Sequence, residues 1–430
     1  MICRQSLLSA RVSLLAACSF ALIAAAGSTT VAEVSATRLD GSAIAGELRS
    51  WNTTELKLAT PGGDQQIPTN QLASLRWSAP APPGAADAAG AVELIDGSVL
   101  PIKSVRVEKS QAILTLAAAP DSKPLELPIS QVSLIRLRQL DGPLATQWDE
   151  IHRQKLAGDV IVVAKKDGKS LDYVEGVMGD IADDKIEFKL DGESQRVDRA
   201  KIAGAIYYRP DRRLKEEPKA SIQGRSGLRV NAAHVDLKDG VLEVTTAAGV
   251  QLSWPVQDVS LADFSAGKLM YLSDIEPTSS EGTPFVGRSP SARLAGLYER
   301  YRRDKSAFGG PLALVTKEGE ATTTQSAPRT YSKGLAVRSR AELVYRLPPG
   351  FQRFITVAGI DPATSTTGTV RLAILGDDRV LLETDVVGGE AAQPIQLDIA
   401  DVKRLKIVVD YGQNLDTGDW LNLCDARIAK

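Results

Sequence analysis

The chain has 430 residues, carries 51 Lys and Arg against 53 Asp and Glu, and is 43% hydrophobic. This length predicts about three or more domains rather than one. The balanced charge supplies no field that would attract nucleic acid or an anionic membrane surface, so we expect no nucleic acid partner.

Residues 1–32 have the pattern of an export signal. Arg4 and Arg11 supply positive charge before an apolar run over 12–26, and small residues suitable for cleavage lie at 24–26 or 30–32. We therefore expect an exported protein in the periplasm, the cell envelope or the extracellular space. An alternative is that Cys18 closes a lipobox and carries a lipid anchor. No later segment reaches the roughly 20 apolar residues of a membrane span, so we expect no transmembrane segment in the mature chain.

Four degenerate repeats, each rich in period-two strands, are predicted before the last third of the chain. In three of them an apolar residue follows four positions after a proline, and the third repeat keeps the offset with an aspartate: Pro68 and Leu72, Pro128 and Val132, Asp198 and Ile202, Pro255 and Val259. The predicted repeats cover 33–77, 92–140, 159–209 and 219–266. Their size of about 40–50 residues favours small SH3-like barrels.

Composition marks the connections between these repeats. Residues 78–91 are Ala, Pro and Gly with almost no charge, which is typical of a linker. A helical connector is predicted over 141–158, with its helix at Thr146–Leu156 and with Trp148 and Ile151 on one side. A second helix is predicted over Ser291–Arg303, from the spacing of four side chains: Leu294, Leu297, Tyr298 and Tyr301.

Residues 268–430 predict an antiparallel β-sandwich. Apolar residues alternate in three runs, which are Leu343, Tyr345 and Leu347, then Val370, Leu372 and Ile374, then Leu405, Ile407 and Val409. The whole chain is thus expected to be all-β, with four small barrels followed by a C-terminal β-sandwich. Cys424 lies in the last apolar strand, where a small buried side chain is expected.

Three motifs in this segment follow the order of a known family. They are Tyr331 to Val337, Leu347 to Phe354, and Asp425-Ala426-Arg427. With them the segment resembles the NPCBM family, a carbohydrate-binding module associated with family 98 glycosyl hydrolases. The resemblance implies a jelly-roll, galactose-binding-like sandwich and a glycan or polysaccharide as partner. It covers only the last third of the chain.

Sugar sites combine an aromatic face with planar polar groups, because a pyranose offers both C–H and O–H surfaces. Such residues gather near the closing loop, with Arg338 as a further donor to hydroxyl pairs or a carboxylate: Trp420, Tyr411, Asp416, Asp419, Asn422 and Arg338. The competing interpretation places Trp420 in the core and makes the acids turn formers. We interpret the motif residues Tyr331, Lys333, Asp425 and Arg427 as structural, for instance as a partly buried ion pair.

Four aspartates could instead supply oxygen ligands to a structural Ca²⁺: Asp361, Asp410, Asp416 and Asp419. They lack the spacing of an EF-hand, so solvated carboxylates are the competing interpretation. No other cofactor is expected.

Two positions depart from the family pattern. Arg338 stands where members often have histidine, and Leu423 stands where they often have tryptophan. A leucine is absorbed more easily by a core than by a stacking platform, so the change at Leu423 leaves the fold intact while the ligand specificity is open.

The sequence therefore favours a non-catalytic carbohydrate-binding protein. An alternative is a structural or assembly protein of the cell envelope that binds other envelope proteins. A glycoside hydrolase is favoured least, because His152 and His234 stand in no nucleophile motif and no catalytic-sized domain frames a carboxylate pair.

Overall fold

The computed structural model describes residues 33–78, 88–117, 123–165, 168–211, 213–283, 300–315, 328–364, 367–413 and 415–430. The predicted export signal, with Cys18, and most of the predicted 78–91 linker lie outside these residues. The described chain is built of antiparallel β-strands and short 3-10 turns with one α-helix, so the all-β prediction is confirmed. No described helix is long and apolar enough to cross a membrane.

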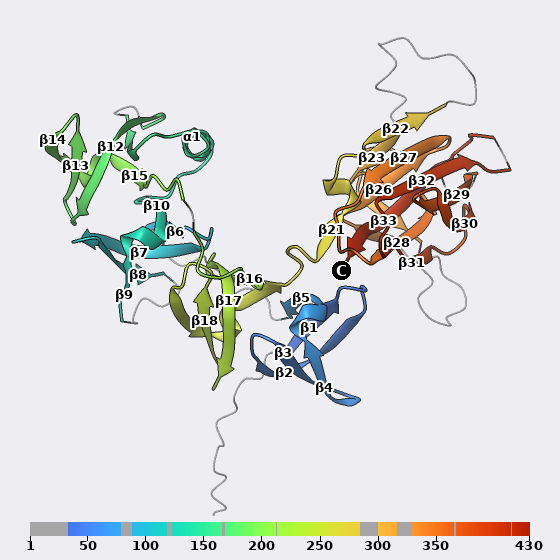
Figure 1. The fold of residues 1–430 in the computed structure, drawn as a ribbon, viewed down its shortest axis with the longest axis horizontal. Helices are drawn as coiled ribbons and strands as arrows, with labels where there is room; N and C mark the ends of the chain where they lie inside the picture. The colour runs from blue at the N-terminus through green and yellow to red at the C-terminus, as the bar shows by residue number, and fades with distance from the viewer. Residues whose placement is uncertain are drawn as a thin grey trace, which may run out of the picture.

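The first two thirds of the chain form four units of five strands each (Figure 1). Unit 1 comprises β1 (Glu33–Arg38), β2 (Ala43–Trp51), β3 (Glu55–Thr60), β4 (Gly63–Pro68) and β5 (Leu72–Trp77). Unit 2 comprises β6 (Gly90–Leu94), β7 (Val99–Glu108), β8 (Gln111–Leu116), β9 (Leu125–Pro128) and β10 (Val132–Arg136). Unit 3 comprises β11 (Asp159–Ala164), β12 (Leu171–Ile181), β13 (Lys185–Leu190), β14 (Glu193–Asp198) and β15 (Ile202–Ile206). Unit 4 comprises β16 (Ala220–Gly224), β17 (Arg229–Lys238), β18 (Val241–Thr246), β19 (Gln251–Pro255) and β20 (Val259–Asp263).

All four units share one pairing scheme. Strands one to four form a meander, and the fifth strand pairs back onto the first. A three-residue 3-10 turn always separates strands four and five: η1 (Thr69–Gln71), η2 (Ile129–Gln131), η3 (Arg199–Lys201) and η4 (Val256–Asp258). The proline or aspartate found in the sequence caps each turn. The apolar residue four positions later begins the fifth strand, and that residue is fully buried in every unit. The sequence offset is therefore explained by one turn that recurs.

The units also pair with each other through their fifth strands. Strand β5 of unit 1 pairs antiparallel with β20 of unit 4, where Leu75 faces Ala262. Strand β10 of unit 2 pairs in the same way with β15 of unit 3, where Ile135 faces Ala205. Each of these four residues lies seven positions after the capping proline or aspartate, and all four are fully buried. The two pairs of units are therefore joined by equivalent positions, as expected for a local two-fold arrangement.

Buried apolar side chains connect the four units into one cluster. Trp51 of unit 1 packs edge-on against Phe264, which follows the last strand of unit 4, with ring centroids 5.9 Å apart. Helix α1 (Pro143–His152) covers units 2 and 3 on one side and buries Trp148 and Ile151. The helical connector is thus confirmed, although the helix begins three residues earlier than predicted and ends at His152.

The rest of the chain folds into a β-sandwich, which confirms the predicted C-terminal architecture. One sheet, here called the first sheet, runs β23 (Tyr301–Arg303), β26 (Gly334–Arg338), β33 (Trp420–Ala429), β28 (Arg353–Ile360) and β31 (Gln393–Asp398), with β21 (Leu269–Tyr271) also paired to β33. The second sheet runs β22 (Ser279–Gly282), β27 (Ala341–Arg346), β32 (Arg404–Tyr411), β29 (Thr369–Gly376) and β30 (Arg379–Val387). The apolar residues of the three predicted alternating runs lie in the core between the two sheets.

The helix predicted over Ser291–Arg303 is wrong at its end. Tyr301–Arg303 forms strand β23, in which Tyr301 pairs with Val337 and packs toward the core, so pairing with a neighbouring strand overrides the helical spacing. Leu294, Leu297 and Tyr298 lie outside the described residues.

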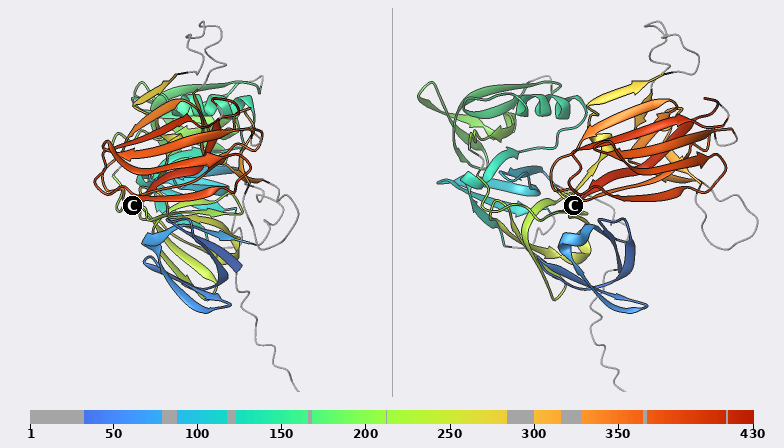
Figure 2. Two further views of the ribbon diagram at one scale, coloured as in Figure 1. Left: turned by 90° about the vertical axis from the view of Figure 1, so that its right-hand side faces the viewer. Right: turned by 45° about the vertical axis from the view of Figure 1, so that its right-hand side comes forward.

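The sandwich abuts unit 1, and the C-terminus lies between them (Figures 1 and 2). Leu39 of unit 1 forms a small apolar cluster with Ile355 and Ala429 of the sandwich. The Lys268 ammonium donates a hydrogen bond to the Thr69 carbonyl over 3.3 Å. These contacts fix the end of β33 against the first unit.

The pairing of units 2 and 3 leads to a stability prediction at Gly204. A Cβ placed there would lie 2.3 Å from the Ile135 carbonyl oxygen and 2.6 Å from the Trp148 ring. We expect Gly204→Ala to lower the free energy of unfolding by about 1–3 kcal/mol, because the backbone between the units must shift. Thermal or urea unfolding measures it. Gly62→Ala is the matched control, since its Cβ would meet only Thr60 Oγ1 at 3.8 Å; equal stability of the two variants would contradict the close approach.

Candidate functional site

The candidate site lies where strand β33 begins, on the outer face of the first sheet. Leu421 and Leu423 point inward and are fully buried in the core between the sheets. Trp420, Asn422 and Cys424 point to the opposite, outer face. The position where the family often has tryptophan is thus a core position in this chain. Its leucine fills the core, as the sequence interpretation held.

A strap covers part of this outer face. It comprises residues 304–315, which include β24 (Leu312–Leu314), and strand β25 (Arg329–Tyr331), which pairs with β24 in an antiparallel hairpin. The Asn422 side-chain amide donates to the Ala313 carbonyl over 3.1 Å, and Asn422 is fully buried. Asn422 therefore holds the strap on the sheet. Cys424 is also buried there, and burial raises the pKa of its thiol, so it behaves as the small apolar side chain expected from the sequence.

Trp420 is half-buried at the end of the strap. It packs at the edge of the apolar cluster under the hairpin, and the Arg302 guanidinium lies 5.8 Å from the centroid of its ring. Arg338 is its register partner on β26 and reaches Asp416 at 3.7 Å. An aromatic ring, two arginines and a carboxylate are thus brought together, as the sequence predicted for Trp420, Arg338 and Asp416.

Asp419 does not join this surface. Only 1% of it is exposed, and its carboxylate accepts hydrogen bonds from the Ser339 hydroxyl at 2.7 Å and the Thr369 amide at 3.1 Å. Burial raises the pKa of Asp419 above its ordinary value of 3.8, against the opposing effect of these donors. Asp419 is therefore a structural tie between the turn after β26 and strand β29.

Tyr411 is held by its hydroxyl group, which donates to the Thr283 carbonyl over 2.6 Å. Burial raises the pKa of this hydroxyl, and the nearby Asp416 and Asp410 add to the effect. Its ring is partly buried at the end of the second sheet. The structure gives Tyr411 a role in fastening the chain near β22, whereas the sequence placed it in a sugar site.

The four aspartates considered for calcium serve different local purposes. Asp361 is 3% exposed and accepts from the amides of Ala307 and Ala363, each at 3.0 Å. Asp410 accepts from the Tyr411 amide and lies 3.8 Å from the Arg340 guanidinium. Within the described ranges no three His, Cys, Asp or Glu side chains are grouped as metal ligands would be. Asp361 and Asp419 are buried and bond to protein groups, so these two are not the solvated carboxylates of the competing interpretation. Asp410 and Asp416 lie within reach of Arg340 and Arg338.

One residue at this end of the sandwich was missed by the sequence interpretation. Phe308 is 73% exposed at the tip of a turn in the strap. An isolated aromatic directly before Gly309 and Gly310 was the available signal, but a single loop phenylalanine has no period from which its position could be inferred.

The motif residues at both ends of the family pattern fasten the sandwich. Lys333 forms ion pairs with Asp274 and Asp304 on two other segments. Asp425 has a backbone φ of 51°, a left-handed conformation that aspartate tolerates better than most residues. The Arg427 guanidinium lies 3.8 Å from the Asp425 carboxylate, with 11% of its side chain exposed, so the predicted partly buried ion pair is present.

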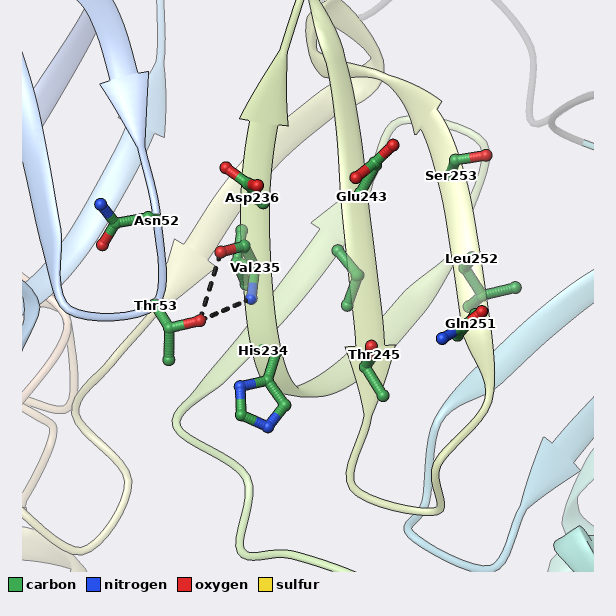
Figure 3. A pocket seen from close by; sticks show the side chains of 11 residues that line it. Asn52, Thr53, His234, Val235, Asp236, Glu243, Thr245, Gln251, Leu252 and Ser253 are labelled. Carbon is green, nitrogen blue, oxygen red and sulfur yellow. Dashed lines mark hydrogen bonds between the residues drawn. The ribbon is translucent and has the colours of Figure 1, made fainter.

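A cavity of about 790 Å³ lies elsewhere, between units 1 and 4 (Figure 3). Thr53 of unit 1 both donates to and accepts from the backbone of Val235 at its edge. The acidic side chains in its wall, Asp236 and Glu243, share the Lys238 ammonium at 2.7 and 3.0 Å. Among the described residues that line it there is no Phe, Tyr or Trp. The described wall of the cavity therefore offers no aromatic face.

The C-terminal part of the chain is an antiparallel two-sheet β-sandwich that carries the outer-face cluster at one end. Residues 268–429 match the family model of the NPCBM/NEW2 domain, so this part of the chain is an NPCBM/NEW2 domain.

One curated relative and two solved structures are also similar. A Renibacterium salmoninarum protein named "Putative endo-alpha-N-acetylgalactosaminidase" is 25% identical over 201 residues, which are 42% of this chain and 13% of the relative. The chain therefore spans only a small part of that protein. A CBM51 module from a Clostridium perfringens GH95 protein, solved with methyl-galactose, is 21% identical, with a TM-score of 0.31 over 37% of this chain and 99% of that one. Tandem CBM51 modules of a Streptococcus pneumoniae family 98 glycoside hydrolase are 15% identical, with a TM-score of 0.31 over 68% and 92%.

The Lys333 ion pairs lead to a pH prediction. Burial opposes ionisation of Asp304, but hydrogen bonds, including that from Lys333, outweigh it and lower the pKa of Asp304 below 3.8. A lowered carboxyl pKa stabilises the fold above pH 3.8, and this stabilisation is lost as the pH falls through the pKa of the folded state. We expect Lys333→Met to cost roughly 1 kcal/mol near neutral pH and less at about pH 3.

Thermal melts of both proteins between about pH 7 and pH 3 test this. Lys406→Met is the control, because Lys406 pairs with Glu342 at 3.0 Å with a similar exposure. A constant difference between Lys333→Met and the unaltered protein across this range would contradict the role of the ion pair.

Proposed function

We propose that this is an exported, non-catalytic carbohydrate-binding protein whose C-terminal sandwich recognises a glycan or polysaccharide. The observation that supports it most is the cluster of Trp420, Arg302, Arg338 and Asp416 at one end of an NPCBM/NEW2 domain. An arginine and a carboxylate beside an aromatic surface can bond paired hydroxyl groups while a C–H face packs on the ring. Export rests on the signal pattern of residues 1–32, with lipid attachment at Cys18 as its alternative.

The absence of catalysis is part of the proposal. Asp419 is buried and tied to Ser339, and Asp416 is paired with Arg338, so neither offers a free general acid or base. His234 lies 2.8 Å from Glu216 in the wall of the cavity between units 1 and 4, and no nucleophile motif accompanies it. The glycosidase name of the relative belongs to a protein of which this chain matches 13%.

We assign the four units to small SH3-like barrels that act as a spacer and as a second contact surface. The common five-stranded pairing with a 3-10 turn before the fifth strand supports this assignment. Their paired arrangement gives a rigid base on which the sandwich is mounted.

The second candidate function is assembly of the cell envelope through contacts with other proteins. The cavity between units 1 and 4 favours this assembly function, because its polar wall is formed jointly by two units rather than by one. In that case the sandwich would carry no sugar-binding activity.

A glycan array probed with the full chain separates these candidates. We expect saturable binding that Arg338→Met weakens by at least about tenfold, which corresponds to 1.4 kcal/mol, with an unchanged melting temperature. Arg371→Met is the matched control, because Arg371 lies on the second sheet and pairs with Glu383 at 3.0 Å. A folded protein that binds no glycan would reject the proposal and favour the assembly function.

A further inference from the structure

The outer-face site needs an exposed aromatic face, and Trp420 does not supply a whole one. Part of its ring packs against the apolar cluster under the hairpin, and the Arg302 guanidinium lies over the ring. Tyr411 is fastened through its hydroxyl to Thr283. A pyranose requires a flat apolar surface open to solvent. Trp420 and Tyr411 are both partly buried.

Phe308 offers such a surface. At 73% exposure its side chain is the most exposed among the large apolar residues of the described chain. Exposed apolar residues are common on proteins and mean little alone. Phe308 differs because the backbone on both sides of it is fastened.

The turn that carries Phe308 is held by three hydrogen bonds. The Ser306 amide donates to the Gly310 carbonyl at 2.9 Å, and the Gly309 amide donates to the Ser306 carbonyl at 3.0 Å. The Ala307 amide donates to the Asp361 carboxylate at 3.0 Å, and both of these residues are buried. The ring is therefore presented to solvent on a fixed support, which reduces the entropy lost when a ligand binds.

The same contacts place this turn beside Trp420. The Asp361 amide donates to the Trp420 carbonyl at 2.9 Å, so the residue that anchors the turn also borders the tryptophan. A Cβ added at Gly309 would lie 3.8 Å from Nη1 of Arg302, the arginine over the Trp420 ring. Leu415, 53% exposed, directly precedes Asp416, the carboxylate that Arg338 reaches. Exposed apolar side chains thus occur in two segments next to members of the cluster, with Phe308 beside Gly309 near Arg302 and Leu415 before Asp416.

We propose that Phe308 is the stacking platform of the glycan site, with Trp420 and Arg302 as its supporting floor and Arg338 and Asp416 as its polar contacts. This inference rests on the proposed function of the sandwich. The ligand it fits is a pyranose with one C–H face free of axial hydroxyl groups. Such a face can lie flat on the Phe308 ring while hydroxyl groups at the edge of the sugar reach Arg338 and Asp416.

The test uses the full chain and the glycan bound most strongly on the array. Phe308→Ala is expected to raise the dissociation constant at least about tenfold, and Phe308→Trp is expected to retain binding within about threefold, because only the second keeps a flat ring. The melting temperature of both should match that of the unaltered protein, since the side chain is exposed. Tyr208→Ala is the control for a lost surface aromatic, because Tyr208 is 42% exposed and lies outside the sandwich.

Tryptophan fluorescence gives a second readout. Four of the five native tryptophans, Trp51, Trp77, Trp148 and Trp254, are at most 6% exposed in the N-terminal units. Emission from Phe308→Trp should therefore change on adding the glycan more than emission from the unaltered protein, whose response reports Trp420 alone.

The outcomes are distinct. Equal affinity of Phe308→Ala and the unaltered protein, with binding still lost in Arg338→Met, would overturn the platform while leaving the proposed function in place. Absence of binding by the unaltered protein to every glycan on the array would overturn both. Loss of binding in Phe308→Ala with retention in Phe308→Trp would support the platform.

Discussion

Strand β33 is the constraint on which the sandwich depends. It is paired with β26, β28 and β21, so it is the strand through which the first sheet is connected. Before Asp425 its odd-numbered residues enter the core, and after Asp425 its even-numbered residues do, as Leu423 and Ala426 illustrate. A bulge at Asp425, where β28 also changes register, causes this switch. In this chain the motif Asp425-Ala426-Arg427 is therefore structural, since the bulge lets residues at both ends of β33 enter the core.

The regular features of the fold were predictable from the sequence because they repeat. Alternation identified the sandwich strands, and the offset of four residues after a proline, or after Asp198 in unit 3, marked the start of every fifth strand. The pairing between units was not predictable, because the residues at the junctions look like ordinary core residues: Leu75, Ile135, Ala205 and Ala262. Nothing local distinguishes a strand buried within one unit from a strand that also pairs with another unit. The predicted helix ending at Arg303 failed for a related reason. Tyr301, the last of the four side chains at helical spacing, lies instead in β23, whose three residues pair with β26.

The site was predicted in part. Arg338, Asp416 and Trp420 are brought together by the position of β33. Arg338 on β26 is the register partner of Trp420, and Asp416 in the loop before β33 lies near Arg338. Asn422 and Asp419 were placed at the site by their sequence proximity, yet one faces the strap and the other enters a buried tie. A loop near a candidate aromatic contains both ligand-facing and backbone-bonding polar residues, and only the direction of each side chain separates them. Phe308 lies more than a hundred residues upstream, so proximity in the sequence could not reveal it.

The same strand also separates the site from the rest of the molecule. Trp420 begins β33 and Ala429 ends it, and at the usual rise of a strand these positions are about 30 Å apart. Ala429 packs against Leu39 of unit 1, and a Cβ at Gly41 would meet the Arg427 guanidinium. The candidate site therefore lies at the end of the sandwich far from unit 1, and the first unit cannot complete it. What the paired units can determine is the direction in which the site is presented, because the strand that carries Trp420 is fixed to them at its other end.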